Sequence, residues 1–209
     1  MNLIKSLEWR YATKRFDATK KVKQADLEFL KESVRLAASS YGLQFYKVLI
    51  IENQEIKEKL KPASYDQSQI TESSHLFVFC QFDKLTDEHV ADYIKLVADT
   101  QNMNINDLKG YSQLIKGSIA AKTNIEQENW NAKQTYIALG NLLAAAGELQ
   151  IDACPMEGFE AAKYDEILGL KEKGLKATVI AAVGYRSPED QTQFAKKVRK
   201  SKEDLFVTI

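Results

Sequence analysis

A short cationic segment near the N-terminus is the part of the sequence best suited to chemistry. Arg10, Lys14 and Arg15 fall within residues 10–17, together with the small residue Ala12. Arginine can hold two oxygens of one anion, lysine acts as a movable point charge, and loop amides add further donors. The segment therefore predicts a site for an anion the size of a phosphate. The simpler alternative, preferred on this segment alone, is that the cations only complement the C-terminal dipole of a preceding short helix.

The rest of the chain offers no conventional catalytic set. His75 and His89 are the only histidines, so neither a Ser-His-Asp triad nor a histidine-rich metal site is expected. The acidic residues are scattered over polar helix faces, and neither GxGxxG nor GxxxxGK[ST] occurs, which argues against a Rossmann or P-loop site. A chain with anion-binding groups but no evident acid, base or nucleophile suits a bound cofactor that carries the reaction.

Composition predicts an ordinary globular protein. The 209 residues are 44% hydrophobic with a formal net charge of zero, which predicts one domain over residues 1–209, alone or as a dimer, and no nucleic-acid partner. Cys80 and Cys154 sit in apolar runs and are expected to be buried, reduced thiols. The sequence lacks a signal-peptide core and any apolar run long enough for a bilayer, so we expect a cytoplasmic protein with no membrane contact.

The elements that must position these residues follow from hydrophobic periodicity. Strands are expected at residues 45–51, 76–82 and 177–185, with a short extended piece and a turn at 151–159. Helices are expected at residues 26–38, 54–61, 87–102, 122–149 and 161–168. Few strands interleaved with more numerous helices predict an α+β fold, in which a short sheet is wrapped by helices.

Two further segments carry expectations about assembly and access. Residues 136–147 are apolar all round, which predicts a helix buried on every side, either as a central helix or as a dimer seam. Residues 102–118 are polar and weakly patterned, with Gly110 and Gly117 among them. We interpret them as a variable excursion that covers a site.

Five segments, in order and approximate spacing, resemble the FMN-dependent nitroreductase family. They are residues 10–16 (RYATKRF), 39–40 (SS), 155–159 (PMEGF), 169–174 (GLKEKG) and 200–202 (KSK). The chain is most similar to the branch of oxygen-insensitive NAD(P)H nitroreductases and dihydropteridine reductases. No single segment decides the matter, but five in register make the resemblance specific.

The resemblance implies a fold, an assembly and an activity. The fold would be a mixed, mainly antiparallel sheet wrapped by helices, with a long central helix and a C-terminal strand, from residues 204–209, exchanged between subunits. The protein would be a homodimer with the active site shared between subunits. It would use FMN and NAD(P)H to reduce nitroaromatics, quinones or related acceptors by ping-pong two-electron transfer. A flavin reductase or another specialised reductase of this fold, and a non-catalytic flavin-binding dimer, are the alternatives.

The resemblance also assigns roles to residues. Arg10, Lys200 and Lys202 would hold the FMN phosphate, while Ser39 and Ser40 would come from the partner subunit. Lys14 would face N1 and O2 of the isoalloxazine, where a cation stabilises the reduced, anionic ring. Glu157 would act through its backbone N–H near N5. Lys14 and Glu157 are the predicted catalytic residues. The full set implied to contact FMN is Arg10, Tyr11, Ala12, Lys14, Ser39, Ser40, Asp66, Gln69, Met156, Glu157, Gly158, Lys200 and Lys202.

The chain departs from the family pattern at several of these positions. Many relatives carry a serine where this chain has Ala12, which removes one hydroxyl contact to the phosphate. Gly42 replaces a usual asparagine, and Lys202 stands where an arginine is common and gives up a bidentate contact. These differences bear on flavin affinity and substrate preference rather than on the fold.

Overall fold

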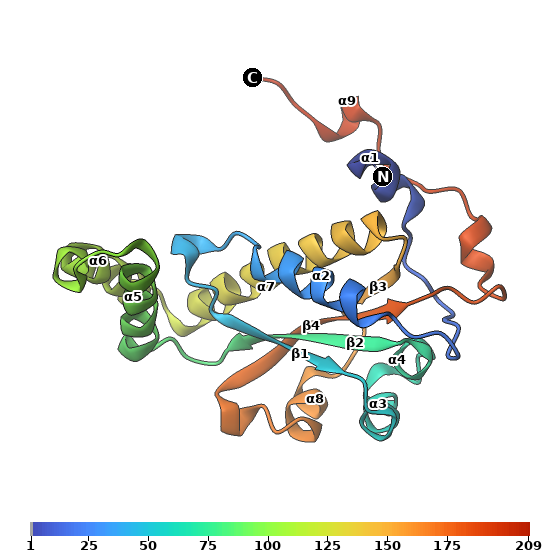
Figure 1. Ribbon diagram of the computed structural model, residues 1–209, viewed down its shortest axis with the longest axis horizontal. Helices are drawn as coiled ribbons and strands as arrows, with labels where there is room; N and C mark the ends of the chain where they lie inside the picture. The colour runs from blue at the N-terminus through green and yellow to red at the C-terminus, as the bar shows by residue number, and fades with distance from the viewer. Residues whose placement is uncertain (1) are drawn as a thin grey trace.

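Within residues 2–209, which the computed structural model describes, four strands form one antiparallel sheet (Figure 1). The strand order is β1-β2-β4-β3, so the two most apolar strands lie in the middle. Their bounds are β1 Tyr46–Ile51, β2 His75–Phe82, β3 Asp152–Met156 and β4 Leu175–Gly184. All four lie where the sequence predicts extended chain. The α+β class and the antiparallel sheet are therefore confirmed.

Helices cover both faces of the sheet (Figure 1). Alternate side chains of β2 point to opposite faces and pack into two separate hydrophobic cores. Phe77 and Phe79 pack beneath α2 (Gln24–Arg35) and α7 (Asn124–Glu148). Leu76, Val78 and Cys80 face the opposite side. The helices of that side are α3 (Gln54–Leu60), α4 (Gln69–Glu72) and α8 (Ala161–Ile167). Cys80 and Cys154 are both free and buried, as predicted.

The N-terminal helix α1 (Leu3–Trp9) packs against the end of α7 and delivers the cationic segment to the sheet. The approach is close at Gly147, where an added Cβ would lie 3.1 Å from the Ser6 carbonyl oxygen. After α1 the chain runs along the outer edge of β3, and Ala12 forms a parallel bridge with Ala153. Phe16 then forms an antiparallel bridge with Arg186.

The segment expected as a weakly patterned excursion is mostly helical, which corrects the prediction for residues 102–118. It follows α5 (Asp87–Gln101) as a 3₁₀ turn, Ile105–Leu108, and then α6, Lys109–Ala120. Leu108 and Ile115 are buried against α5 in a third, smaller core. Packing of these few apolar residues outweighs the low helix propensity of the glycines in α6.

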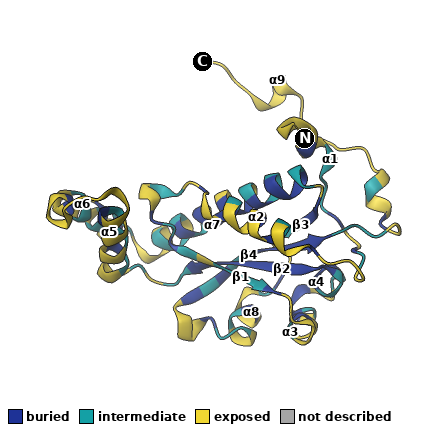
Figure 2. Cartoon of the chain, in the orientation of Figure 1, coloured by how far each residue is buried: buried dark blue, intermediate teal, exposed yellow. Residues whose placement is uncertain are grey.

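The burial expected for α7 on every side is wrong for the single chain. Ala138, Leu142 and Ala145 are buried, but Tyr136 and Ile137 on the other side are 41% and 44% exposed. Figure 2 shows the mixed exposure of this helix. The chain's own sheet and neighbouring helices cover only one side of α7, so the alternative of a dimer seam remains.

The C-terminal tail leaves the body of the protein (Figure 1). After a 3₁₀ turn, Gln191–Phe194, a single helical turn, α9 (Lys202–Leu205), precedes the last residues. Phe206 and Val207 are 68% and 85% exposed, and the exchange of this segment as a strand stays a prediction. Among the described residues, no helix is both long and apolar enough to cross a membrane.

Candidate functional site

The cationic loop at residues 10–17 is fixed by polar contacts along its length. Arg10 ends α1, and its N–H donates to the Ser6 carbonyl oxygen at 3.0 Å. The buried Thr13 hydroxyl donates to Asp152 at 3.2 Å. Lys14 is exposed, and its backbone N–H donates to Asp190 at 2.8 Å. The loop therefore presents Lys14 to solvent from a fixed backbone.

Arg10 lies beside two cations from the other end of the chain. Lys197 and Arg199 line one cavity of about 450 Å³ with Arg10, Tyr11, Ala12 and Pro155. The Lys197 amino group donates to the carbonyl oxygens of Leu7 and Arg10. Lys196 and Glu8 line the same cavity, so the chain gathers four cations and one carboxylate there from segments nearly 190 residues apart.

The electrostatics of this cavity favour an anion. Burial, and then Arg199, lowers the pKa of Arg10. Burial, and then Arg10 and Arg199, lowers the pKa of Lys197. The Arg10 Nε atom is buried without a hydrogen-bond partner among the described residues. Crowded cations and an unsatisfied buried donor are what an anion would relieve.

The lysines chosen from the sequence lie elsewhere on the tail. Lys200 and Lys202 are exposed, and neither is among the residues that line the cavity with Arg10. Lys202 begins α9 instead. Their role as phosphate contacts stays a prediction, whereas Lys197 and Arg199, which sequence reasoning missed, share the cavity with Arg10. The run KKVRKSK offers a cation at nearly every position, so the sequence alone does not select the pair.

A second loop joins Lys14 to the turn after β3. Gln67 donates from Nε2 to the carbonyl oxygens of Ser64 at 3.0 Å and Gly158 at 2.8 Å. Ser68 donates to the Lys14 carbonyl oxygen at 3.4 Å. The predicted contact residue Asp66 is exposed in this loop, and it has a left-handed φ of +56°. Gln67 was not predicted, because no motif distinguishes it from its polar neighbours.

Cys154 of β3 marks the point where several predicted residues converge. Burial raises the pKa of its thiol, and Lys14, Gln69 and Arg10 each act on it in the opposite direction. Ala12, which lies between the two cations in the chain, forms a bridge with Ala153, so the cationic loop runs beside this stretch of β3. Met156, two residues further on, is buried.

Glu157 occupies the turn at the end of β3. Its carboxylate accepts a hydrogen bond of 2.6 Å from the Tyr136 hydroxyl of α7. Burial and this bond raise the pKa of Tyr136 to about 12. This hydrogen bond holds the carboxylate against α7. The backbone N–H of Glu157 is then the group left for the contact near N5 that the resemblance implies. That catalytic role of Glu157 stays a prediction.

Ser39 and Ser40 are not brought to the cationic loop of the same chain. They follow α2, which ends near α5 and α6, at the end of the sheet away from the loop at residues 10–17 (Figure 1). The Ser39 hydroxyl accepts from the Gln44 N–H at 3.0 Å, and the Ser40 N–H donates to Gln134 at 2.8 Å. A role in the site thus requires a second chain, as the resemblance implies.

Comparison with known proteins decides the family. The family model described as "Nitroreductase family" matches residues 7–185. The chain belongs to the nitroreductase family. A Staphylococcus haemolyticus protein assigned as an NAD(P)H nitroreductase is 34% identical over 221 residues, covering 98% of this chain and 95% of that protein. The major NAD(P)H-flavin oxidoreductase of Aliivibrio fischeri is 32% identical over 214 residues, covering 99% of this chain and 98% of that protein.

Solved structures agree on the nitroreductase fold. A protein of Exiguobacterium sibiricum, assigned as a nitroreductase and crystallised with FMN, superposes with a TM-score of 0.85 at 16% identity. The match covers 100% of this chain and 98% of that protein. The family and fold predicted from the sequence are therefore confirmed, while the roles of individual residues remain to be tested.

Proposed function

We propose that this nitroreductase-family protein is a homodimeric FMN-dependent oxidoreductase that takes electrons from NAD(P)H and passes them to nitroaromatics, quinones or related acceptors. The observation that carries the proposal is the cavity where Arg10, Lys197 and Arg199 meet. FMN supplies the redox chemistry when bound, since none of the side chains that line the cavity can accept two electrons and release them again.

The phosphate end of the cofactor fits this cavity. Four cations against the single carboxylate of Glu8, together with the unsatisfied Arg10 Nε, are suited to a dianionic phosphate group. Arg10 and Arg199 can each offer two donors to the phosphate oxygens, and Lys197 adds a point charge. The similarity to a protein crystallised with FMN supports the same ligand.

The ring end fits the surface that leads away from the cavity along β3. Lys14 would hold its ammonium group against the pyrimidine edge, where negative charge develops on reduction. Asp66 and Gln69 would bond the polar edge of the same ring. The backbone amides of Glu157 and Gly158 would meet the ring from the turn, which Gln67 fixes through the Gly158 carbonyl oxygen.

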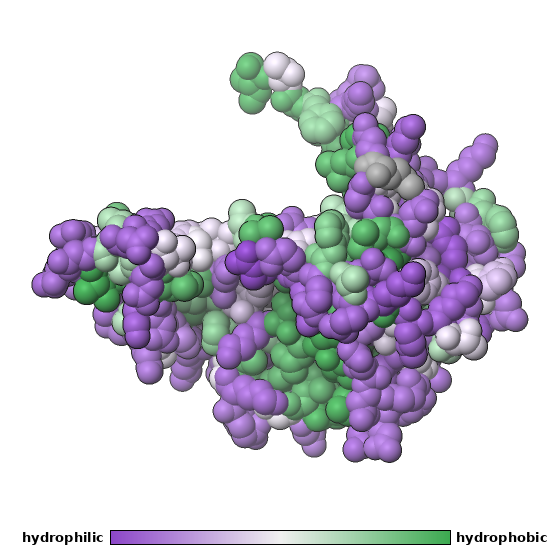
Figure 3. All heavy atoms as spheres, viewed as in Figure 1, coloured by the Kyte–Doolittle hydropathy of each residue, from purple (hydrophilic) through white to green (hydrophobic). Residues whose placement is uncertain are grey.

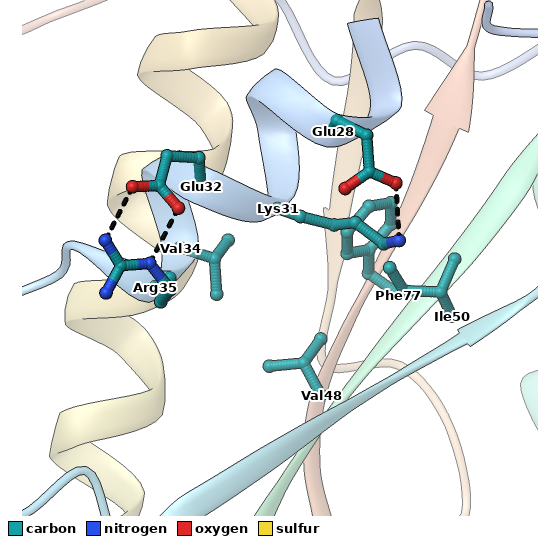
Figure 4. A pocket seen from close by; sticks show the side chains of 8 residues that line it. All are labelled: Glu28, Lys31, Glu32, Val34, Arg35, Val48, Ile50 and Phe77. Atoms are coloured by element: carbon teal, nitrogen blue, oxygen red, sulfur yellow. Dashed lines mark hydrogen bonds and ion pairs between the residues drawn. The ribbon is translucent and has the colours of Figure 1, made fainter. Parts of the chain in front are cut away.

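Two apolar surfaces support the homodimer. The tail at residues 204–209 exposes apolar side chains that the single chain does not bury. The outer edge of β1 has no strand partner among the described residues, and Figure 3 shows apolar side chains gathered on this face. Between β1 and α2 lies a cavity of about 390 Å³ lined by Val34, Val48, Ile50 and Phe77 (Figure 4).

The tail of a second copy would occupy this groove and pair with the open edge of β1, because an unpaired edge accepts an extended segment. The ion pairs Glu28–Lys31 and Glu32–Arg35 frame the groove in Figure 4 with polar groups, which suits an apolar strand with solvent-exposed flanks. The same assembly would bring Ser39 and Ser40 of one chain toward the flavin of the other.

Steady-state kinetics test the proposal. The chain has no separate dinucleotide motif, so donor and acceptor would use one cavity in turn. Initial rates measured while both NADPH and a nitroaromatic are varied should give parallel double-reciprocal lines. Intersecting lines, which require both substrates bound together, would contradict the shared cavity. Absence of any NAD(P)H oxidation by FMN-loaded protein would contradict the oxidoreductase assignment itself.

A second candidate acceptor is free flavin, because the A. fischeri relative is an NAD(P)H-flavin oxidoreductase. Lys14 and Asp66 are both exposed, which would leave this side of the site accessible to a second flavin. The ratio of kcat/KM for added FMN to kcat/KM for a nitroaromatic separates the two activities.

A further inference from the structure

Asp190 is a buried carboxylate between the two chain ends that build the cationic cavity. It is only 1% exposed. Its Oδ2 accepts from the Lys14 N–H at 2.8 Å, the Arg15 N–H at 3.4 Å and the Tyr11 hydroxyl at 3.0 Å. Its Oδ1 accepts from the Thr192 N–H at 2.9 Å. One oxygen therefore holds the N-terminal loop and the other holds the start of the C-terminal segment.

The two groups that Asp190 joins are the two sources of cations. The residues bonded to Oδ2 belong to the loop that runs from Arg10 to Arg15. Thr192 is the second residue of the 3₁₀ turn Gln191–Phe194, which Asp190 caps and which leads to Lys197 and Arg199. Thr192 itself lines the cavity. The Lys197 amino group also joins these segments through the Arg10 carbonyl oxygen, and Phe16 forms a bridge with Arg186, so the carboxylate is one of several polar links and the one that is buried.

The carboxylate is held in its ionised form by these donors. Burial would raise the pKa of Asp190, but hydrogen bonds from the Lys14 and Thr192 backbone and from the Tyr11 hydroxyl outweigh burial and lower it. A buried anion stabilised by backbone N–H groups fixes the backbone that carries them. The negative charge itself opposes the binding of another anion nearby, so a charge this close to the cavity requires a structural reason.

We propose that Asp190 is a positioning residue that sets the spacing between Arg10 and the Lys197–Arg199 segment for a phosphate. This inference rests on the proposed function, because the phosphate is that of FMN. Loss of the carboxylate would loosen the two segments, which the Lys197 amino group would still join through the Arg10 carbonyl oxygen, and the cations would no longer be held at the spacing that suits a phosphate. Asp190 acts through the cations and does not itself contact the ligand.

The alternative is that Asp190 contributes only background charge. In that case its removal would leave the cavity more positive, and an anion would bind more tightly. The two accounts therefore predict changes of opposite sign for the same substitution.

The test compares Asp190→Asn with Glu189→Gln in full-length protein freed of flavin. The asparagine keeps the shape but can accept on one side only, so either Lys14 or Thr192 loses its partner. Glu189→Gln removes the same charge one residue away, from a side chain that is 76% exposed and lies 3.8 Å from Arg15. Dissociation constants are measured for FMN and for riboflavin, which lacks the phosphate, and circular dichroism checks folding.

For Asp190→Asn we expect the Kd of FMN to rise about tenfold or more, as for loss of one hydrogen bond to a charged group, while the Kd of riboflavin changes little. Glu189→Gln should leave both constants nearly unchanged. An equal rise for FMN and riboflavin would indicate general loosening and overturn the inference. Tighter FMN binding by Asp190→Asn would overturn it in favour of background charge.

A second variant keeps the test decisive if Asp190→Asn fails to fold. Tyr11→Phe removes one donor to Oδ2 and retains the ring, over which the Arg186 guanidinium lies at 4.6 Å. It should weaken FMN binding severalfold and spare riboflavin, and no change in the ratio of the two constants would contradict the inference. If the wild-type protein bound neither flavin, the proposed function would fail first, which is a separate outcome.

Discussion

The pair Lys197 and Arg199 provides the sharpest test of the phosphate site. The change is the double substitution Lys197→Ala with Arg199→Ala, which removes two of the four cations at the cavity of Arg10. A hydrogen bond to a charged group contributes about 1.5–3 kcal/mol. Both side chains are exposed in the single chain, and water screens such charges, so we take the lower end for each.

The expected loss is then about 3 kcal/mol, which corresponds to a rise of roughly 100-fold in the Kd of FMN. Titration of the apoprotein with FMN, followed by quenching of flavin fluorescence, measures this constant directly. The matched control is Lys200→Ala with Lys202→Ala, which removes the same charge from the same segment. Lys200 and Lys202 are exposed, and exposed charges contribute about 0–1 kcal/mol, so the Kd of this variant for FMN should stay within about fivefold of wild type.

The ranking of the two double variants decides between the structure and the sequence-based assignment. A larger loss in the Lys200 and Lys202 variant would refute our reasoning and restore the residues that the sequence predicts. Equal losses in both variants would mean that net charge, rather than the cavity at Arg10, governs affinity for FMN.

Three further changes test the assembly and the fold. Deletion of residues 205–209 should shift sedimentation from dimer toward monomer and lower flavin retention, since the tail would cover the open edge of β1; unchanged sedimentation would contradict the proposed exchange. Gly147→Ala should lower the free energy of unfolding by about 1–3 kcal/mol in urea titrations, because its Cβ would lie 3.1 Å from the Ser6 carbonyl oxygen, and no loss would mean that α1 shifts freely. Burial lowers the pKa of Lys57 from 10.5 to about 8, so between pH 8 and 10.5 the unfolded chain binds more protons at this residue than the folded chain. The free energy of unfolding of the wild type should therefore rise with pH over this range relative to that of Lys57→Met. Parallel pH profiles of the two proteins would contradict this.

The sheet and most helices could be predicted because local patterns and tertiary packing agree there. The apolar run at residues 76–82 forms the central strand β2, and the spacing of Leu27, Leu30 and Val34 gives the buried face of α2. Residues 102–118 were mispredicted for a physical reason. Their helices depend on a few buried contacts such as those of Leu108 and Ile115, and neither composition nor periodicity reveals such contacts.

The candidate site could be predicted only where a residue's chemistry is visible in its own sequence neighbourhood. Arg10 and Lys14 stand out as cations in a short loop, and the structure gathers them near β3. Lys197, Arg199, Gln67 and Asp190 were missed, because each acquires its role only when loops distant in sequence meet. Only the structure shows that Lys196, Lys197 and Arg199 are the cations of the C-terminal run that share a cavity with Arg10.

Anaerobic titration of the FMN-loaded protein with NADPH, followed in the flavin absorption band, tests the central claim most directly. The account predicts that one equivalent of NADPH per chain bleaches the band and that a nitroaromatic added afterwards, still without oxygen, restores it. A protein that binds no FMN, or one whose bound flavin keeps its full absorbance in excess NADPH and NADH, would contradict it.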